Sequence, residues 1–557
     1  MQLRCSLWYR LGAVAALLTA CGVGGCCRSA DSQQASVMWP PTFSPGMNLK
    51  VPLPDGTRLM TDVYAPSGRG PWPIILLRTP YNPDKQSYTQ LAKDLNAAGV
   101  VYVVQSARGQ FGSEGQPDFF AHDRQDARDM ITLLAAQSWS NGKIGMMGHS
   151  APGIESYLAL PNVDGRPADL ACAWIEMATP DLQKTAFQDG VFRKKLTENW
   201  LRDNNMAALI PDVIASATNA SWWTTRRITQ DYDKIDVPTV HLTGWFDIFT
   251  NEQIDAFIGA HQAGAPSQYL IIGPWTHDDI DLRAQGDLTF PANANLQTDV
   301  LFEQFMARFL LGTGDLRGWP TVRYYTMGDV DEPSAPGNEW RTADQWPPFT
   351  PNPTPVYLRV GGSLSTIPPE AGEQADQYDY DPDDPAPTVG GNNLFLPRGP
   401  RDQSALEARS DILTYTSALL PSPVEVTGKV AAKIHLRCNR PDTDLIVRLC
   451  DVYPDGRSIP VTEGALRLRF RNQSGPADGT LMTPGQTYEI ELALWPTSII
   501  FNAGHRLRVH VTSSSDPRFD PNPNTGDALR ANGTTAVATV TILHDQASPS
   551  RIILPTP

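Results

Sequence analysis

The stretch Gly148-His149-Ser150-Ala151-Pro152-Gly153 follows the apolar run 144–147 and precedes the run 154–160, which can begin a helix. A serine on a glycine-flanked turn between a strand and a helix is the layout of a nucleophile elbow. Such a turn leaves no room for a Cβ beside the serine, and it aims a helix N-terminus at the reaction centre. The second glycine comes one position later than in the commonest form of the motif. The motif alone therefore does not identify Ser150 as a nucleophile, and residues further along the chain are needed.

The sequence around this stretch alternates between buried strands and helices. The runs 73–77 and 100–104 are continuously apolar, which is typical of strands buried on both faces of a parallel sheet. Further strands are predicted at 144–147, 172–177, 238–242 and 269–272, with helices at 87–98, 123–137, 249–261 and 300–311. Repeated strand-then-helix units predict an α/β domain with a mostly parallel sheet.

Two segments do not follow this alternation of strands and helices. Residues 179–236 have a helical composition and carry Phe187, Trp200, Trp222 and Trp223. We interpret them as a cap over the site, although any single aromatic residue is better explained by the small core of the insertion itself. The domain plan is therefore an α/β core at 46–178 and 237–350, interrupted by a cap at 179–236.

From about residue 351 the hydrophobic pattern changes to period 2. Val430, Ala432, Ile434 and Leu436 alternate with other residues, and turn signals separate several such runs. This pattern predicts an all-β sandwich over 351–557, of the jelly-roll type. The acidic run 376–384 lacks the glycine and spacing of an EF-hand, and we interpret it as a solvated connector.

Length and charge restrict the functional class. A chain of 557 residues is too long for one core, so two or three domains are expected. The net charge of −15 argues against nucleic acid or an anionic membrane surface as a partner.

The N-terminus has the character of an export signal. Arg4 and Arg10 flank a short apolar segment, 11–18, which is too short to span a bilayer and fits a signal peptide over 1–20. Leu18-Thr19-Ala20-Cys21 resembles a bacterial lipobox, with Cys21 as the lipidated residue and 21–45 as a tether. We expect an exported, lipid-anchored envelope protein that meets a membrane only through this anchor. Ordinary secretion is the alternative.

Cysteine usage indicates neither a disulfide scaffold nor a zinc site. Of the 7 cysteines, only Cys172, Cys438 and Cys450 lie outside the leader region, and no Cys-x-x-Cys pair occurs among them. Whether Cys438 and Cys450 form a disulfide is left open by the sequence. We expect no metal and no cofactor.

A catalytic triad can be assembled by position. In an α/β hydrolase the order along the chain is Ser, then Asp or Glu, then His, each on a loop directly after a strand. Asp247 follows the strand predicted at 238–242, and His277 follows the one at 269–272. Of the 9 histidines, His277 alone has both the right order and a position after a strand.

Two groups are candidates for the oxyanion hole. The backbone N–H of Ala151, the residue after the serine, is the first expected donor. The second is the hydroxyl of Tyr81, in the loop after strand 73–77, for which an ordinary half-buried tyrosine is the alternative. Trp245, Phe246 and Phe249, which flank the acid, are candidates for lining the substrate pocket.

Several collinear motifs resemble the cocaine-esterase family of α/β hydrolases, which is related to X-prolyl dipeptidyl peptidases and α-amino-acid ester hydrolases. They are Arg78-Thr79-Pro80-Tyr81, Arg108-Gly109-Gln110-Phe111-Gly112-Ser113-Glu114-Gly115, the elbow, Gly244-Trp245-Phe246-Asp247 and Gly273-Pro274-Trp275-Thr276-His277, followed by Pro441-Asp442-Thr443-Asp444 and Gly504-His505-Arg506 in the β region. The resemblance implies an α/β-hydrolase core with an inserted helical cap and a C-terminal jelly roll, with substrates bound where the three parts meet. It implies Ser150, Asp247 and His277 as the triad, and Tyr81 and Ala151 as the oxyanion hole. The family usually has Tyr directly after the serine, whereas Ala151 leaves space there.

The leading hypothesis is a serine hydrolase that cleaves carboxylic esters or amides through an acyl-enzyme. An X-prolyl dipeptidyl peptidase, acting on short peptides, is the alternative, and it needs an anionic group for the free N-terminus of its substrate. A non-catalytic lipoprotein whose β domain binds glycans is a third hypothesis.

Overall fold

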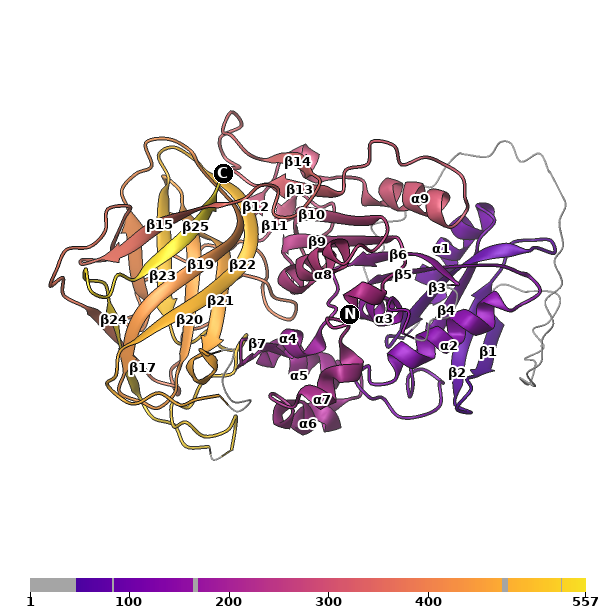
Figure 1. Ribbon diagram of the computed structural model, residues 1–557, viewed down its shortest axis with the longest axis horizontal. Coiled ribbons are helices and arrows are strands. Elements are labelled where there is room, and N and C mark those ends of the chain that lie inside the picture. The colour runs from indigo at the N-terminus through magenta and orange to yellow at the C-terminus, as the bar shows by residue number, and fades with distance from the viewer. Residues whose placement is uncertain (1–46, 83–84, 164–168, 473–478, 532) are drawn as a thin grey trace.

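The computed structural model describes residues 47–82, 85–163, 169–472, 479–531 and 533–557. An α/β body and an all-β body lie side by side, with a small helical region between them on one edge (Figure 1). The predicted signal peptide 1–20, the tether 21–45 and Cys21 lie outside the described residues. No helix in the described part is both long enough and apolar enough to cross a membrane.

A sheet of 10 strands forms the centre of the α/β body, in the order β1-β2-β4-β3-β5-β6-β9-β10-β13-β14. From β4 to β13 neighbouring strands pair in parallel, whereas β1, β2 and β14 pair antiparallel at the edges. The strands are β1 Met47–Pro52, β2 Arg58–Tyr64, β3 Trp72–Thr79, β4 Val101–Ser106, β5 Ser140–His149, β6 Leu170–Glu176, β9 Thr239–Phe246, β10 Gln268–Thr276, β13 Val322–Thr326 and β14 Glu339–Ala343. The predicted mostly parallel sheet is confirmed.

Helices cover both faces of this sheet. Because successive side chains of a strand point to opposite faces, β3 contributes Ile74 and Leu76 to one core and Ile75 and Leu77 to another. Helices α2 (Asp123–Ala135), α3 (Ala151–Ala159) and α8 (Thr250–Gln262) pack on the first face, and α1 (Lys85–Ala97) and α9 (Thr298–Phe309) pack on the second. The continuous apolar runs are therefore strands buried on both sides.

The helical insertion lies between β6 and β9. It consists of α4 Leu182–Ala186, β7 Phe187–Gln188, β8 Val191–Phe192, α5 Lys194–Asp203, α6 Ile210–Ala215 and α7 Ala220–Trp223, with short 3-10 turns between them. Phe187 and Trp223 are buried, and their ring centroids are 6.3 Å apart. These two aromatic residues therefore belong to the hydrophobic core. Trp200 differs, because it is half-buried and faces the elbow.

The all-β body is a second, extensive sheet structure. Its strand order is β17-β24-β19-β25-β15-β16-β18-β23-β20-β21, and β22 pairs with β19. The strands are β15 Asn352–Arg359, β16 Ser363–Ser365, β17 Asp376–Tyr380, β18 Leu413–Ser417, β19 Val424–Cys438, β20 Asp444–Val452, β21 Ser458–Arg467, β22 Tyr488–Phe501, β23 Arg506–Thr512, β24 Ala538–Leu543 and β25 Arg551–Thr556. The predicted all-β region is confirmed, and Val430, Ala432, Ile434 and Leu436 are all buried.

The acidic run 376–384 is a partial exception to the sequence analysis. Its first half is not a connector, because Asp376–Tyr380 forms strand β17 and pairs antiparallel with β24. Tyr378 and Tyr380 are buried and alternate with polar residues. The sequence therefore has the period-2 pattern of a strand here, but the many acidic side chains made it hard to recognise. Asp376 accepts a hydrogen bond from Tyr415 at 2.9 Å.

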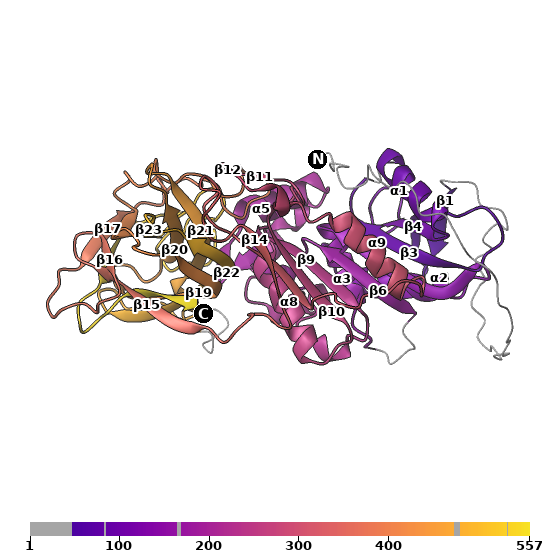
Figure 2. The ribbon, with the colours of Figure 1, turned by 90° about the horizontal axis from the view of Figure 1, so that it is seen from above.

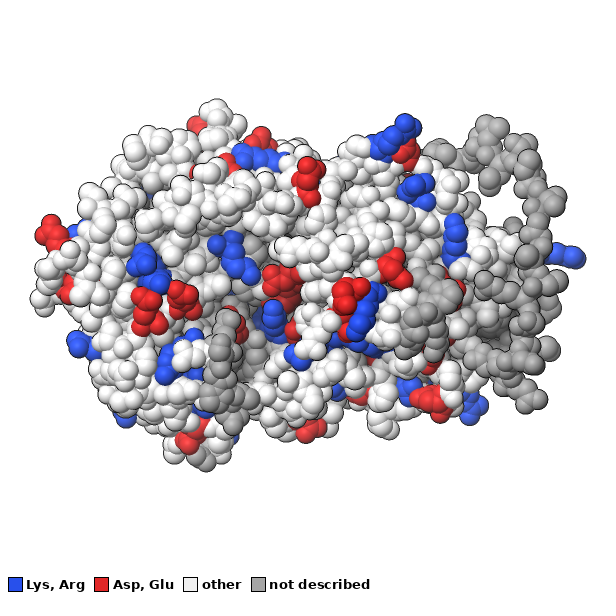
Figure 3. Space-filling view, in the orientation of Figure 1, with Lys and Arg blue, Asp and Glu red and all other residues white. Residues whose placement is uncertain are grey.

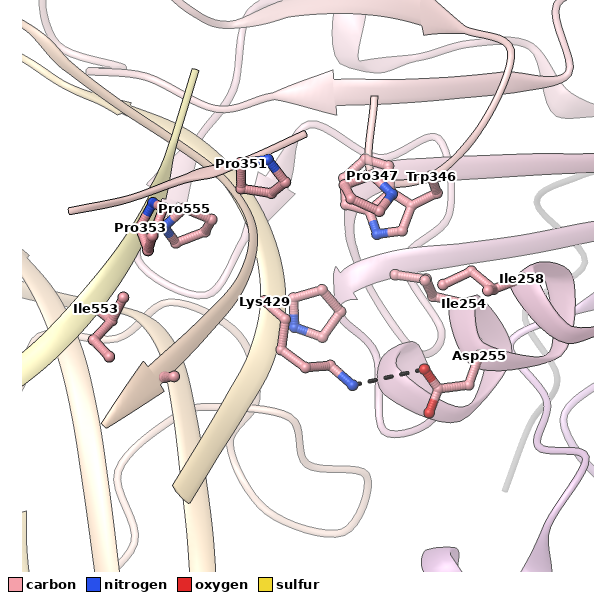
Figure 4. A pocket seen from close by; sticks show the side chains of 12 residues that line it. Ile254, Asp255, Ile258, Trp346, Pro347, Pro351, Pro353, Lys429, Ile553 and Pro555 are labelled. Carbon is pink, nitrogen blue, oxygen red and sulfur yellow. Dashed lines mark ion pairs between the residues drawn. The ribbon is translucent and has the colours of Figure 1, made fainter. Parts of the chain in front are cut away.

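The two bodies share a continuous hydrophobic core at the β13–β14 end of the first sheet (Figure 2). The backbone N–H of Met327, just after β13, donates to the carbonyl of Ser498 in β22 at 2.9 Å. Beside this junction, α8 and the all-β body enclose a cavity of about 260 Å³, and Lys429 points across it to Asp255 at 3.6 Å (Figure 4). The side of the α/β body that carries α8 is therefore packed against the all-β body.

Cys172, Cys438 and Cys450 are buried free thiols, so the disulfide that the sequence left open between Cys438 and Cys450 is not formed. On the face shown in Figure 3, basic and acidic side chains are interspersed. That face thus presents charges of both signs, whereas a nucleic-acid backbone requires a basic surface.

Candidate active site

Ser150 occupies a strained turn between β5, which ends at His149, and α3, which begins at Ala151. Its φ of 63° and ψ of −126° are unusual for a residue with a side chain. A Cβ on Gly148 would lie 2.2 Å from the carbonyl carbon of Pro152, and a Cβ on Gly153 would lie 2.7 Å from the Cβ of Ala178. The late second glycine is therefore needed, because the first turn of α3 packs against the segment after β6.

Asp247 and His277 follow neighbouring parallel strands, so they reach the same edge of the sheet as Ser150. The Ser150 Oγ lies 2.9 Å from His277 Nε2, and His277 Nδ1 lies 2.5 Å from Asp247 Oδ1. Ser150 is 6% exposed, and the other two side chains are fully buried. These contacts form a continuous hydrogen-bonded chain, shielded from bulk water, in which the imidazole can take the serine proton while the carboxylate orients the ring.

The second carboxylate oxygen of Asp247 is held separately from the first. Oδ2 accepts hydrogen bonds from the backbone N–H of Phe249 at 2.8 Å and from the hydroxyl of Thr243 at 3.4 Å. Asn392, which follows β17 in the chain, donates to the backbone carbonyl of Asp247 at 2.7 Å. Asn392 could not be found from the sequence, because no local pattern marks a residue that reaches the site from the second body.

Tyr81 and Ala151 both lie close to Ser150. Tyr81 lies just after β3, where its backbone N–H donates to the Thr79 hydroxyl at 3.0 Å. Burial raises the pKa of the Tyr81 phenol, while the hydrogen bond from Trp200 and the nearby donor groups of Ser150 and Ala151 act in the opposite direction. The two predicted oxyanion donors are therefore brought together beside Ser150.

An apolar cavity of about 40 Å³ opens next to Ser150. Its lining residues come from the core, the insertion and the all-β side: Phe119, Phe120, Ser150, Ala151, Ile154, Leu182, Thr185, Ala186, Leu196, Thr197, Trp200, Ile248, Phe249 and Leu394. None of these described lining residues carries a charge. The sequence analysis missed most of them, since they are apolar residues in loops and in the insertion.

The three aromatic candidates for the pocket have different surroundings. Phe249 lines the cavity, and its ring centroid is 5.5 Å from that of His277. Trp245 instead donates its N–H to the carbonyl of Tyr325 at 2.7 Å in the shared core. Phe246 lines a different, smaller cavity. Neither Trp245 nor Phe246 lines the cavity beside Ser150, because β9 extends through both residues and places them in its own packing.

A polar group of residues borders the other side of the imidazole. The ring of His149 lies 5.0 Å from that of His277, and its Nδ1 lies 3.7 Å from the Glu176 carboxylate. Burial alone would lower the pKa of His149, but the nearby carboxylate of Glu176 raises it. His149, His277 and Asp278 have ligand atoms within 4.8 Å of one another. Both nitrogens of His277 are already hydrogen-bonded to Ser150 and Asp247, so neither is available as a metal ligand in this arrangement.

Comparison with known proteins identifies the family. The sequence profile of the X-Pro dipeptidyl-peptidase (S15) family matches residues 55–211 and 196–279, and that of the X-Pro dipeptidyl-peptidase C-terminal non-catalytic domain matches 317–553. The cocaine esterase of Rhodococcus sp. (strain MB1 Bresler) is 30% identical over 586 aligned residues, which cover 92% of this chain and 98% of that one. The chain belongs to the cocaine esterase and S15 family of serine hydrolases.

Solved structures agree on the architecture. An α-amino acid ester hydrolase superposes with a TM-score of 0.78 over 95% of this chain and 100% of its own, at 24% identity. A CocE/NonD family hydrolase from Staphylococcus aureus superposes with a TM-score of 0.71 over 92% of this chain and 93% of its own, at 16% identity. At these identities the likeness shows the fold alone, and it confirms an α/β-hydrolase core joined to a C-terminal all-β domain. As a member of the cocaine esterase and S15 family, the protein is a serine hydrolase that acts on esters or on peptides.

Proposed function

We propose that this chain is a carboxylic esterase that carries a short apolar acyl group on Ser150. The observation that supports this proposal is the hydrogen-bonded path from Ser150 through His277 to Asp247, which ends at a cavity lined without charges. The cavity volume of about 40 Å³ corresponds to roughly three water-sized positions, at 10–15 Å³ for each. Such a space suits a small acyl chain.

In this mechanism Ser150 Oγ attacks the ester carbonyl as its proton passes to His277 Nε2. Asp247 keeps the imidazole oriented and stabilises its positive charge. The oxyanion that forms accepts hydrogen bonds from the Ala151 N–H and the Tyr81 hydroxyl, each worth about 10²–10³ in rate. His277 then protonates the leaving alcohol, and water releases the acyl group by the same steps.

Dipeptidyl-peptidase activity is the second candidate, and the lining of the cavity disfavours it. A free substrate N-terminus carries an ammonium group, which is costly to bury without an anionic partner. Glu155, on α3, is fully buried, and it lies 3.7 Å from the Arg78 guanidinium beneath the elbow. Burial raises the pKa of Glu155 well above its usual value. It therefore offers no exposed charge to an amine in the cavity.

We expect p-nitrophenyl acetate to be hydrolysed readily, and Gly-Pro-p-nitroanilide to be hydrolysed no faster than p-nitroacetanilide. The two anilides share a leaving group, so their ratio isolates the effect of the dipeptide and its ammonium from the difficulty of cleaving an amide. An unpaired buried ammonium lowers kcat/KM by about 10²-fold or more. Release of nitroaniline and nitrophenol, followed by absorbance, gives all three values. A dipeptide anilide that is turned over much faster than the acetanilide contradicts the esterase proposal and favours the peptidase.

We also infer that the chain is exported and anchored to a membrane by a lipid on Cys21. The segment Leu18-Thr19-Ala20-Cys21 supports this, because it places small residues before a cysteine that follows a short apolar stretch. We expect the parent protein to partition into the detergent phase of Triton X-114 and Cys21→Ser to partition into the aqueous phase. Cys172→Ser, which changes a buried thiol of the described domain, is the matched control. A parent chain found in the aqueous phase contradicts the anchor.

A further inference from the structure

The hydroxyl of Tyr81 receives a hydrogen bond from the helical insertion. Trp200, in α5, donates its indole N–H to the Tyr81 oxygen at 3.0 Å, and the two rings are 6.5 Å apart in an edge-on arrangement. An indole N–H can only donate, whereas a phenol has one proton and two lone pairs. At this contact Tyr81 must therefore be the acceptor.

This contact fixes where the phenol proton can go. With one lone pair engaged by Trp200, the O–H bond of Tyr81 can point at the elbow, where Ser150 and the Ala151 N–H lie close enough to lower the pKa of the phenol. A hydroxyl that accepts a hydrogen bond also becomes a stronger donor, since hydrogen bonds in a chain polarise one another. The indole thus prepares Tyr81 to donate to a reacting oxygen.

We propose that Trp200 is a positioning residue of the oxyanion site, which orients and polarises the Tyr81 hydroxyl from the cap. The inference rests on the proposed oxyanion role of Tyr81. It also gives the insertion a part in the reaction itself: helix α5 must be docked for the oxyanion site to be complete. The insertion is then more than a wall of the substrate cavity.

The surroundings of Trp200 hold the indole in place. Its ring stacks on Phe120 at a centroid distance of 5.4 Å and an angle of 21°, and it contacts Phe119 at 5.8 Å. Both phenylalanines have positive φ, 53° for Phe119 and 67° for Phe120, which is unfavourable for a residue with a side chain. Packing against Trp200 helps to maintain this unfavourable backbone.

The C-terminal end of α5 is tied to a motif that the mechanism does not otherwise use. Gln110, in the stretch 108–115, donates to the carbonyl of Asn204 at 2.9 Å, and the Asn204 side chain donates to the carbonyl of Trp200 at 2.7 Å. These two bonds connect a loop of the α/β body to the backbone of Trp200. The motif therefore sets the position of α5 relative to Tyr81.

A double-mutant cycle in the full-length chain tests the proposal, with p-nitrophenyl acetate as substrate. Trp200→Phe keeps an aromatic ring in the cavity but removes the N–H, and we expect kcat to fall about tenfold with KM nearly unchanged. Tyr81→Phe alone should lower kcat by about 10²–10³. In the Tyr81→Phe background, Trp200→Phe should then have no further effect, because there is no hydroxyl to orient. The acetyl group is chosen because its small size limits any effect through packing.

Trp319→Phe is the matched control, since it removes an indole N–H that donates to Gln304 at 3.1 Å on an exposed part of α9. It should leave kcat unchanged. If Trp200→Phe has no effect, or lowers kcat equally with and without the Tyr81 hydroxyl, Trp200 acts only through packing and the inference is wrong. If Tyr81→Phe is itself as active as the parent, the oxyanion role of Tyr81 fails first. Melting curves of every variant separate these outcomes from unfolding.

Discussion

Ser150→Ala is expected to lower kcat for p-nitrophenyl acetate by about 10⁶-fold, because a nucleophile and its base act as a unit and neither works alone. The remaining rate would come from the oxyanion donors and from substrate binding. The protein should stay folded, since alanine keeps the Cβ of serine and loses only a hydroxyl that is hydrogen-bonded to His277. Hydrolysis rates and thermal melting of the purified variant provide the measurement.

Ser150→Gly sharpens this experiment. The φ of 63° at Ser150 is a conformation that glycine adopts without a steric cost, whereas a Cβ makes it unfavourable. We therefore expect the glycine variant to be as inactive as the alanine variant and at least as stable. Activity within tenfold of the parent in either variant would show that Ser150 is not the nucleophile.

The positions of Ser150, Asp247 and His277 could be predicted because they depend on topology. Each follows a strand of a parallel sheet, and the carboxyl ends of parallel strands meet at one edge. Their side chains lie within hydrogen-bonding distance in the structure, as that argument requires. Their roles in catalysis remain predictions for the variants described here.

The C-terminal ends of β9 and β10 were harder to predict, because each strand continues through a glycine. The sequence suggested that strands end at 242 and 272, but β9 runs to Phe246 and β10 to Thr276. Gly244 and Gly273 come just after these predicted ends, and glycine is common in turns. A Cβ on Gly244 would lie 2.2 Å from the Trp275 carbonyl oxygen, and one on Gly273 would lie 2.3 Å from the Trp275 ring. These glycines therefore permit a close approach inside the sheet.

The substrate cavity could not be predicted, because its walls meet only after the parts of the chain have docked. Trp200 comes from the insertion, Leu394 comes from the segment after β17, and Phe119 and Phe120 reach the cavity through a loop with positive φ. Trp200 does lie four residues after Leu196, but this helical spacing is as typical of a core as of a cavity wall. An aromatic residue in a helix is more often part of a core, which is correct for Trp223 and not for Trp200.

Asp247→Asn is expected to lower kcat by about 10⁴-fold with little change in KM, by reversing the tautomer of His277. The argument depends on the second oxygen of the carboxylate. Oδ2 accepts the backbone N–H of Phe249 at 2.8 Å, so an asparagine must keep its carbonyl oxygen at that position. Its NH₂ group then faces His277 Nδ1, which lies 2.5 Å from the other oxygen in the parent protein.

An NH₂ group can only donate, so His277 must present the lone pair of Nδ1 and carry its proton on Nε2. That proton points at Ser150 Oγ, 2.9 Å away, and the imidazole can no longer act as a base. Asp255→Asn, which makes the same change in α8 at a carboxylate paired with Lys429, should leave kcat unaltered (Figure 4). Steady-state kinetics on both variants measure the effect. A kcat for Asp247→Asn within tenfold of the parent would show that the orientation of His277 does not depend on this carboxylate.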